Sequence, residues 1–133
     1  MNSIKNLSFA GICMAFVVIA LGAWTRLVDA GLGCPDWPGC YGFIVFPTSE
    51  AEIALAESRY PMFPYDINKA ISEVVHRYFA AALGVFAIFL VYLSFKKTKD
   101  RAIKGWSSFL LFFICCQGVF GYLTVSLKLL PII

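Results

Sequence analysis

Three long apolar runs constrain this chain more than any other feature. They cover approximately residues 8–27, 70–95 and 106–127. A helix needs about 20 mostly apolar residues to cross a bilayer, and a helix can satisfy its own backbone hydrogen bonds in lipid. With 60% hydrophobic and only 14% charged residues, the chain is predicted to be an all-α membrane protein, with three transmembrane helices in a single domain of residues 1–133.

The two connections between these runs differ in charge. The outer connection, residues 28–69, holds six acids and two bases. The short link, residues 96–105, holds one acid, Asp100, and five bases: Lys96, Lys97, Lys99, Arg101 and Lys104. Basic short loops remain in the cytoplasm, so the N-terminus and the short link are predicted inside and residues 28–69 outside. The net charge of +3 follows from this topology, and no basic patch with interleaved aromatics indicates nucleic-acid binding.

The outer connection contains a signal for one short helix. Ser49-Glu50-Ala51-Glu52 fits a capping box, in which a side chain at the start of a helix and a glutamate three residues later satisfy each other's backbone donors. Thr48 or Ser49 is therefore expected to cap a helix that runs through Arg59. Asn68 is expected to cap the second membrane helix.

The single histidine of the chain lies at the outer mouth of the second run, in Glu73-Val74-Val75-His76-Arg77. Residues three and four apart share a helix face, so Glu73, His76 and Arg77 are expected close together. Ionisable groups in a membrane helix are costly and mark functional sites, and an imidazole there suits heme iron. The residues alone leave open a second interpretation, in which an ion pair between Glu73 and Arg77 fixes the helix end beside an interfacial histidine.

Cys34 and Cys40 both fall outside the cytoplasm in this topology, where disulfides persist. The pattern allows a structural staple for a loop with little core, or a redox-active pair that exchanges with a thiol partner. Arg26 closes the first run, and is either a snorkelling interface residue or a counter-charge for a porphyrin carboxylate. Arg77, also at an outer helix end, is a second candidate for that carboxylate contact.

Small residues inside the apolar runs are expected to pack between helices. Gly118 and Gly121 would allow a close approach of two helices. Cys13, Cys115 and Cys116 are expected to be small core residues.

Four segments together resemble the heme A synthase family, the CtaA-type membrane enzymes. They are Trp24-Thr25-Arg26-Leu27, then Gly31-Leu32-Gly33-Cys34-Pro35-Asp36-Trp37-Pro38-Gly39-Cys40, then Glu73-Val74-Val75-His76-Arg77 with Gly84, and finally the segment from Gly121 to Pro131. The resemblance covers nearly the whole chain. It implies a multi-pass protein of the bacterial plasma (inner) membrane that oxidises a methyl group of heme O to a formyl group, giving heme A for terminal oxidases.

The resemblance also implies roles for individual residues. His76 would be an axial ligand of heme iron, Glu73 the catalytic carboxylate, and Cys34 and Cys40 the disulfide of the outer loop. The family has two related four-helix halves, of which the first would take heme O and the second would hold a heme b. Expected partners are heme O, membrane lipid, the heme O synthase, the assembling oxidase and further copies in an oligomer.

The chain stops at Ile133, where the family would begin a fourth helix with the second histidine. It is therefore expected to supply three helices of an incomplete four-helix heme-binding bundle, and not to catalyse the reaction unaided. Two other functions fit the residues. A b-type membrane cytochrome would need His76 but no carboxylate at Glu73. A membrane thiol–disulfide oxidoreductase would need Cys34 and Cys40 but not His76.

Overall fold

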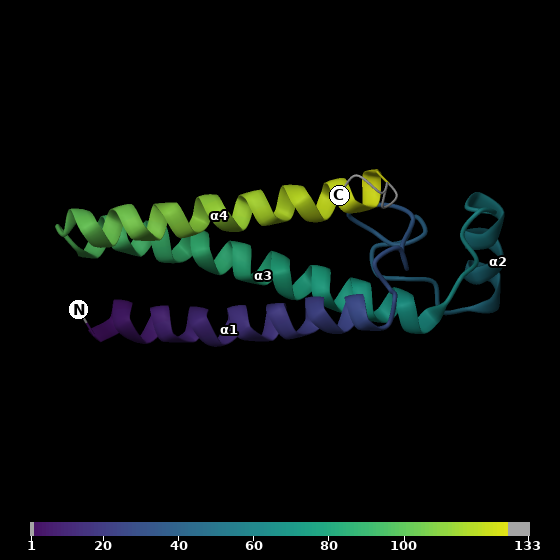
Figure 1. Cartoon of the computed structure of the whole chain (residues 1–133), viewed down its shortest axis with the longest axis horizontal. Helices are drawn as coiled ribbons and strands as arrows, with labels where there is room; N and C mark the ends of the chain where they lie inside the picture. Colours follow the sequence, from purple (N-terminus) through teal and green to yellow (C-terminus); the bar gives the residue numbers. More distant parts are fainter. Residues whose placement is uncertain (1, 128–133) are drawn as a thin grey trace. The chain divides into compact units, whose positions relative to one another are not determined.

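The computed structural model describes residues 2–127, with side chains from Ile4 onward. Four helices follow one another along the chain: α1 (Asn2–Leu27), α2 (Glu50–Arg59), α3 (Ile67–Lys97) and α4 (Arg101–Ser126) (Figure 1). Within residues 2–127 the only extended pairing is an isolated bridge between Cys40 and Phe43. The predicted all-α fold is confirmed.

The three long helices are those expected from the apolar runs. α1, α3 and α4 contain 26, 31 and 26 residues, and each is long and apolar enough to cross a membrane. α3 and α4 extend past their apolar runs into the basic link, because α3 ends on Lys96 and Lys97 and α4 begins at Arg101. Basic side chains in a last turn interact favourably with the helix dipole. The chain is a multi-pass membrane protein.

The capping box of the outer connection is confirmed. Ser49 is the N-cap of α2, and its side chain accepts a hydrogen bond from the Glu52 backbone N–H. In return, the Glu52 carboxylate accepts from the backbone N–H groups of Ser49, at 3.0 Å, and Thr48, at 2.9 Å. These bonds lower the pKa of Glu52 below its usual range.

The cap predicted for α3 is wrong by two residues. Asp66, not Asn68, begins the helix: its Oδ1 accepts from the backbone N–H of Asn68 at 2.9 Å and of Lys69 at 3.3 Å. Asn68 lies in the first turn. Aspartate and asparagine are about equally good N-caps, so only the exact start of the helix distinguishes them, and sequence signals rarely fix such boundaries.

The described residues form two compact units. In the first, made of residues 2–20 and 78–120, the buried hydroxyls of Ser94 and Ser107 lie 2.8 Å apart and join α3 to α4. Asp100 caps α4 through the Ala102 N–H at 2.8 Å. In this unit, α3 and α4 are therefore joined to each other near the basic link.

The second unit contains residues 21–77 and 121–127 and includes the whole outer connection. The outer connection begins with a tight turn at the end of α1. There Asp29 takes a left-handed conformation (φ 52°), and the Ala30 N–H donates to the Thr25 carbonyl. This is the pattern of a Schellman cap. The buried core of the unit is small and consists of Cys34, Cys40, Tyr41, Ala56, Ala70 and Val74.

Two expectations about small residues are not met within the described residues. Cys13 and Cys115 are exposed, and Cys116 is only half-buried. A Cβ added at Gly118 or Gly121 would meet no atom of the described residues within 4 Å. Apolar periodicity does not say which face of a membrane helix meets protein and which meets lipid, since both faces are apolar.

Candidate functional site

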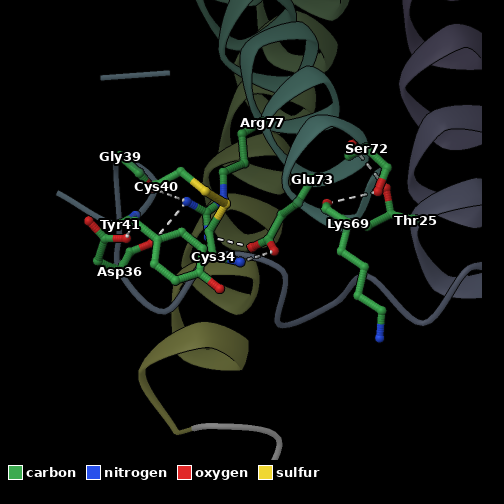
Figure 2. Close-up of polar contacts among 10 residues, drawn as sticks. All are labelled: Thr25, Cys34, Asp36, Gly39, Cys40, Tyr41, Lys69, Ser72, Glu73 and Arg77. Atoms are coloured by element: carbon green, nitrogen blue, oxygen red, sulfur yellow. Dashed lines mark hydrogen bonds and ion pairs between the residues drawn. A yellow bond between two sulfur atoms is a disulfide. The ribbon is translucent and has the colours of Figure 1, made fainter. Parts of the chain in front are cut away.

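The candidate site begins where the outer loop rests on the first turns of α3. Glu73 is buried, with 4% of its surface exposed. Its Oε2 accepts a hydrogen bond from the backbone N–H of Cys34 at 2.9 Å, and its Oε1 pairs with the Arg77 guanidinium (Figure 2). A carboxylate bonded by a backbone N–H and a guanidinium is held in a fixed place.

Arg77 binds the same loop a few residues further along. Its Nη1 donates to the backbone carbonyls of Asp36, at 2.9 Å, and Gly39, at 2.6 Å, while its Nη2 pairs with the Glu73 carboxylate (Figure 2). Glu73 and Arg77 are four residues apart on one face of α3. Together they bind both ends of the loop segment 34–40.

That segment is closed into a ring by a disulfide between Cys34 and Cys40, whose Cα atoms are 4.8 Å apart. Both cysteines are fully buried, so a partner thiol has no access to the sulfurs, which favours a structural staple. The ring is stiffened further by the Asp36 carboxylate, which accepts from the backbone N–H groups of Tyr41 at 2.6 Å and Gly42 at 2.8 Å.

Tyr41 joins the ring to the rest of the loop. It is 1% exposed, its hydroxyl donates to the Pro64 carbonyl at 3.2 Å, and its ring meets Tyr60 and Tyr65 edge to face. Burial, reinforced by the neighbouring Tyr65 and nearby acids, raises the pKa of Tyr41. The neutral phenol is therefore the form that the fold requires.

His76 lies between Glu73 and Arg77 in the sequence, and its side chain faces α1. Its imidazole is half-buried and packs against Gly22. Close by, the Thr25 hydroxyl lies 3.4 Å from the Ser72 carbonyl (Figure 2). Glu73, His76 and Arg77 thus occupy adjacent positions on α3, while the side chains of Glu73 and Arg77 serve the loop.

The residues present suit a heme more than a bare metal ion. Among residues 2–127, no group of three or more His, Cys, Asp or Glu gathers in one place. Heme iron needs only an axial side chain from the protein, because the porphyrin supplies the remaining donors. One half-buried imidazole, packed against the bare backbone of Gly22, fits that requirement.

The two candidate arginines differ in what surrounds them. Arg26 is exposed at the last turn of α1, whereas the guanidinium of Arg77 is already bonded to Glu73, Asp36 and Gly39. Arg26 is therefore the more available cation for an external carboxylate.

Comparison with known proteins identifies the family of the chain. The family model of the cytochrome oxidase assembly protein COX15-CtaA matches residues 5–132. The chain belongs to this family. The resemblance drawn from the Cys34–Cys40 and Glu73–Arg77 motifs is thereby confirmed.

Curated relatives of this COX15-CtaA chain carry the name heme A synthase. The protein from Shewanella oneidensis is 46% identical over 117 residues, which are 88% of this chain and 35% of that protein. Relatives from Chelativorans sp. and Rickettsia bellii are each 32% identical, over 84% and 85% of this chain. The chain spans about a third of the length of these relatives. No solved structure matches it.

Sequence reasoning missed three residues of the site in this COX15-CtaA chain. Gly22 and Ser72 carry no chemical signal of their own, although Ser72 lies four residues before His76 and so shares its face. Asp36 belongs to the motif that carries the family resemblance, but the sequence assigned it no role. Its carboxylate accepts hydrogen bonds from two backbone N–H groups and so shapes the ring. Only the fold shows which groups these residues contact.

Proposed function

We propose that the chain forms the outer, histidine-bearing part of a heme A synthase, which oxidises a methyl group of heme O to a formyl group. The family match over residues 5–132 and the names of the curated relatives support this. The activity is proposed for the complete polypeptide. The observation that carries the proposal is a buried carboxylate, Glu73, one helical turn from the single histidine and fixed beneath a disulfide ring.

His76 is proposed as an axial ligand of heme iron. Bound heme supplies the redox chemistry of the reaction. The protein's part is to hold the porphyrin at a fixed depth through His76, with Arg26, and to a smaller extent Arg77, binding its carboxylates by charge-assisted hydrogen bonds. A heme b is proposed for the second half of the complete polypeptide.

Glu73 is proposed as the catalytic carboxylate, able to stabilise positive charge that develops at the reacting methyl. It is held by the Cys34 N–H and by Arg77 before any reaction begins. A preorganised charge in a site that excludes water stabilises a transition state more than a hydrated one does, because nothing has to reorient. The carboxylate is buried and is bonded to the backbone of the ring formed by Cys34 and Cys40.

The setting proposed for this reaction is the bacterial plasma membrane, with residues 28–69 on the outer side and the basic link inside. Heme O delivered by its synthase and heme A passed to an assembling terminal oxidase are the proposed input and output. An oligomeric assembly is proposed as well.

The catalytic assignment is tested by Glu73→Gln in the complete polypeptide, expressed in a host that lacks its own heme A synthase. Glutamine keeps an acceptor for the Cys34 N–H but removes the charge, so heme content is expected to stay normal while heme A formation stops. Glu73→Asp should restore part of the activity. Glu52→Gln, a carboxylate that only caps α2, is the control and should leave the heme A yield unchanged. Normal yield from Glu73→Gln would leave Glu73 only as the ion-pair partner of Arg77.

A further inference from the structure

α1 meets α3 through small residues at the level of the single histidine. Thr25 is 7% exposed and Ser72 is fully buried, and the Thr25 hydroxyl lies 3.4 Å from the Ser72 carbonyl (Figure 2). Gly22 lies three residues before Thr25 on one face of α1, and His76 lies four residues after Ser72 on one face of α3. The two contacts therefore lie side by side where α1 and α3 meet. The Thr25 hydroxyl, which also donates to the Leu21 carbonyl at 2.8 Å, thus marks the close approach of the two helices where Gly22 faces His76.

Gly22 is in direct contact with the imidazole. A Cβ built on Gly22 would lie 2.9 Å from Cε1, 3.4 Å from Nε2 and 3.5 Å from Nδ1 of His76, and these are its three nearest atoms. A carbon cannot settle 2.9 Å from another carbon, since optimal separations are about 3.5–4.0 Å. Any side chain at position 22 therefore has to displace the ring.

We infer that Gly22 is a positioning residue for His76: the bare backbone of α1 forms the wall against which the imidazole rests, and this wall sets the direction of both ring nitrogens. The consequence for a bound heme rests on the proposed function, whereas the position of the ring itself does not.

The atom that would have to move distinguishes Gly22 from Gly33 in the same unit. At Gly33, an added Cβ would lie 2.7 Å from the backbone carbonyl of Lys69, which belongs to α3 and cannot move without the helix. At Gly22 the obstacle is the end of a side chain that can rotate. Gly22→Ala is thus expected to keep the fold and to reorient the imidazole, which separates positioning from general packing.

The chain contains one histidine, so its labelling gives an unambiguous test. With ¹⁵N- and ¹³C-labelled histidine in the 133-residue chain, purified by a tag without histidine, every imidazole NMR signal belongs to His76. Gly22→Ala is expected to shift these signals and to change their contacts to α1. Gly84→Ala is the matched control, because a Cβ there meets nothing within 4 Å, and it should leave them unchanged. Identical His76 signals in folded Gly22→Ala and in the parent chain would overturn the inference.

A second variant covers the case in which Gly22→Ala does not fold. His76→Ala removes all three of the closest atoms, so Gly22→Ala/His76→Ala should fold as well as His76→Ala alone. Failure of this double variant to recover would show that the space at Gly22 serves something other than the imidazole and would overturn the inference.

A spectrum of the heme-loaded complete polypeptide separates this inference from the proposed function. If His76 ligates iron, Gly22→Ala should change the electron paramagnetic resonance spectrum and lower the heme affinity, and Gly84→Ala should do neither. A shift of the His76 NMR signals with an unchanged heme spectrum would uphold Gly22 as a positioning residue and would remove His76 as the ligand.

Discussion

At the scale of single residues, two ion pairs on α3 differ sharply in burial. Glu73 and Arg77 have side chains that are 6% and 14% exposed and bond to the loop backbone. The ion pair of Lys69 with Asp29, at 3.5 Å, has side chains 38% and 96% exposed. Exposed pairs contribute about 0–1 kcal/mol, whereas removal of one partner of a buried pair leaves a costly charge behind. The buried pair therefore dominates the attachment of the loop.

Arg77→Gln should loosen the disulfide ring from α3. It removes the donors to Asp36 and Gly39 and leaves Glu73 without its cation, which should cost on the order of 3 kcal/mol. That corresponds to roughly hundredfold faster exchange of the amides of residues 34–42, measured by hydrogen-exchange mass spectrometry. Lys69→Gln, at the exposed pair, is the control and should change exchange by less than about fivefold. Equal protection in both variants would contradict the anchoring role of Arg77.

At the scale of elements, the outer loop replaces a large core with a few strong local devices. A disulfide closes residues 34–40, Asp36 binds two backbone N–H groups, and a capping box starts α2. Tyr41 packs in the middle, and Tyr65 beside it donates to the Pro47 carbonyl at 2.6 Å. Each device fixes a turn without much buried apolar surface, which is why so short a segment keeps one shape.

The tyrosines make the loop sensitive to alkali. The fold raises the pKa of Tyr41, chiefly by burial, and that of Tyr65 in the same direction. A raised pKa means that the stabilisation is complete below the unfolded-state pKa, about 10, and declines as the pH rises above it. Tyr41→Phe should flatten this decline while costing about 1 kcal/mol for the lost hydroxyl hydrogen bond.

Fluorescence of Trp37, recorded from pH 8 to 12 under denaturant after Trp24 and Trp106 are replaced by Phe, measures this dependence. Trp37 lies within the disulfide ring, and its ring centroid is 5.6 Å from that of Tyr122. Tyr92→Phe, outside the loop in α3, is the control and should keep the parent profile. A Tyr41→Phe profile as steep as the parent's would contradict the burial argument.

Some elements could be predicted from the sequence, and others could not. The three long helices and the cap at Ser49 follow from local patterns of apolar and capping residues. The contacts of Gly22, Ser72 and Asp36 depend on which segments meet across tens of residues, and no local pattern encodes that. The motifs indicated Glu73 as a reacting group and allowed its ion pair with Arg77, but only the structure gives its bond to the Cys34 N–H.

At the scale of the whole molecule, charge is expected to set the orientation in the membrane. The link between α3 and α4 is strongly basic, and the outer connection is acidic. Moving basic groups across the bilayer against this pattern is disfavoured. The candidate site, which lies at the loop end of α3, should therefore face the outer side.

Reporter fusions test this topology directly. A periplasm-active phosphatase joined at residue 50 should be active, and one joined at residue 99 should be inactive. A cytoplasm-active reporter should give the reverse pattern. Exchange of the five basic residues of the link for glutamine should weaken or mix the orientation, since these residues carry the signal. An active cytoplasmic reporter at residue 50 of the parent chain would place the whole site on the wrong side.

The central claim is that His76 holds heme while Glu73, one turn away, acts on it. The most direct measurement is the heme content and Soret absorbance of the complete polypeptide, purified as parent, His76→Ala and Glu73→Gln, with Gly84→Ala as the control. We predict that His76→Ala loses the heme O bound in the N-terminal half, whereas Glu73→Gln and Gly84→Ala retain it with a normal spectrum. Full heme content and an unchanged Soret band in His76→Ala would contradict the account.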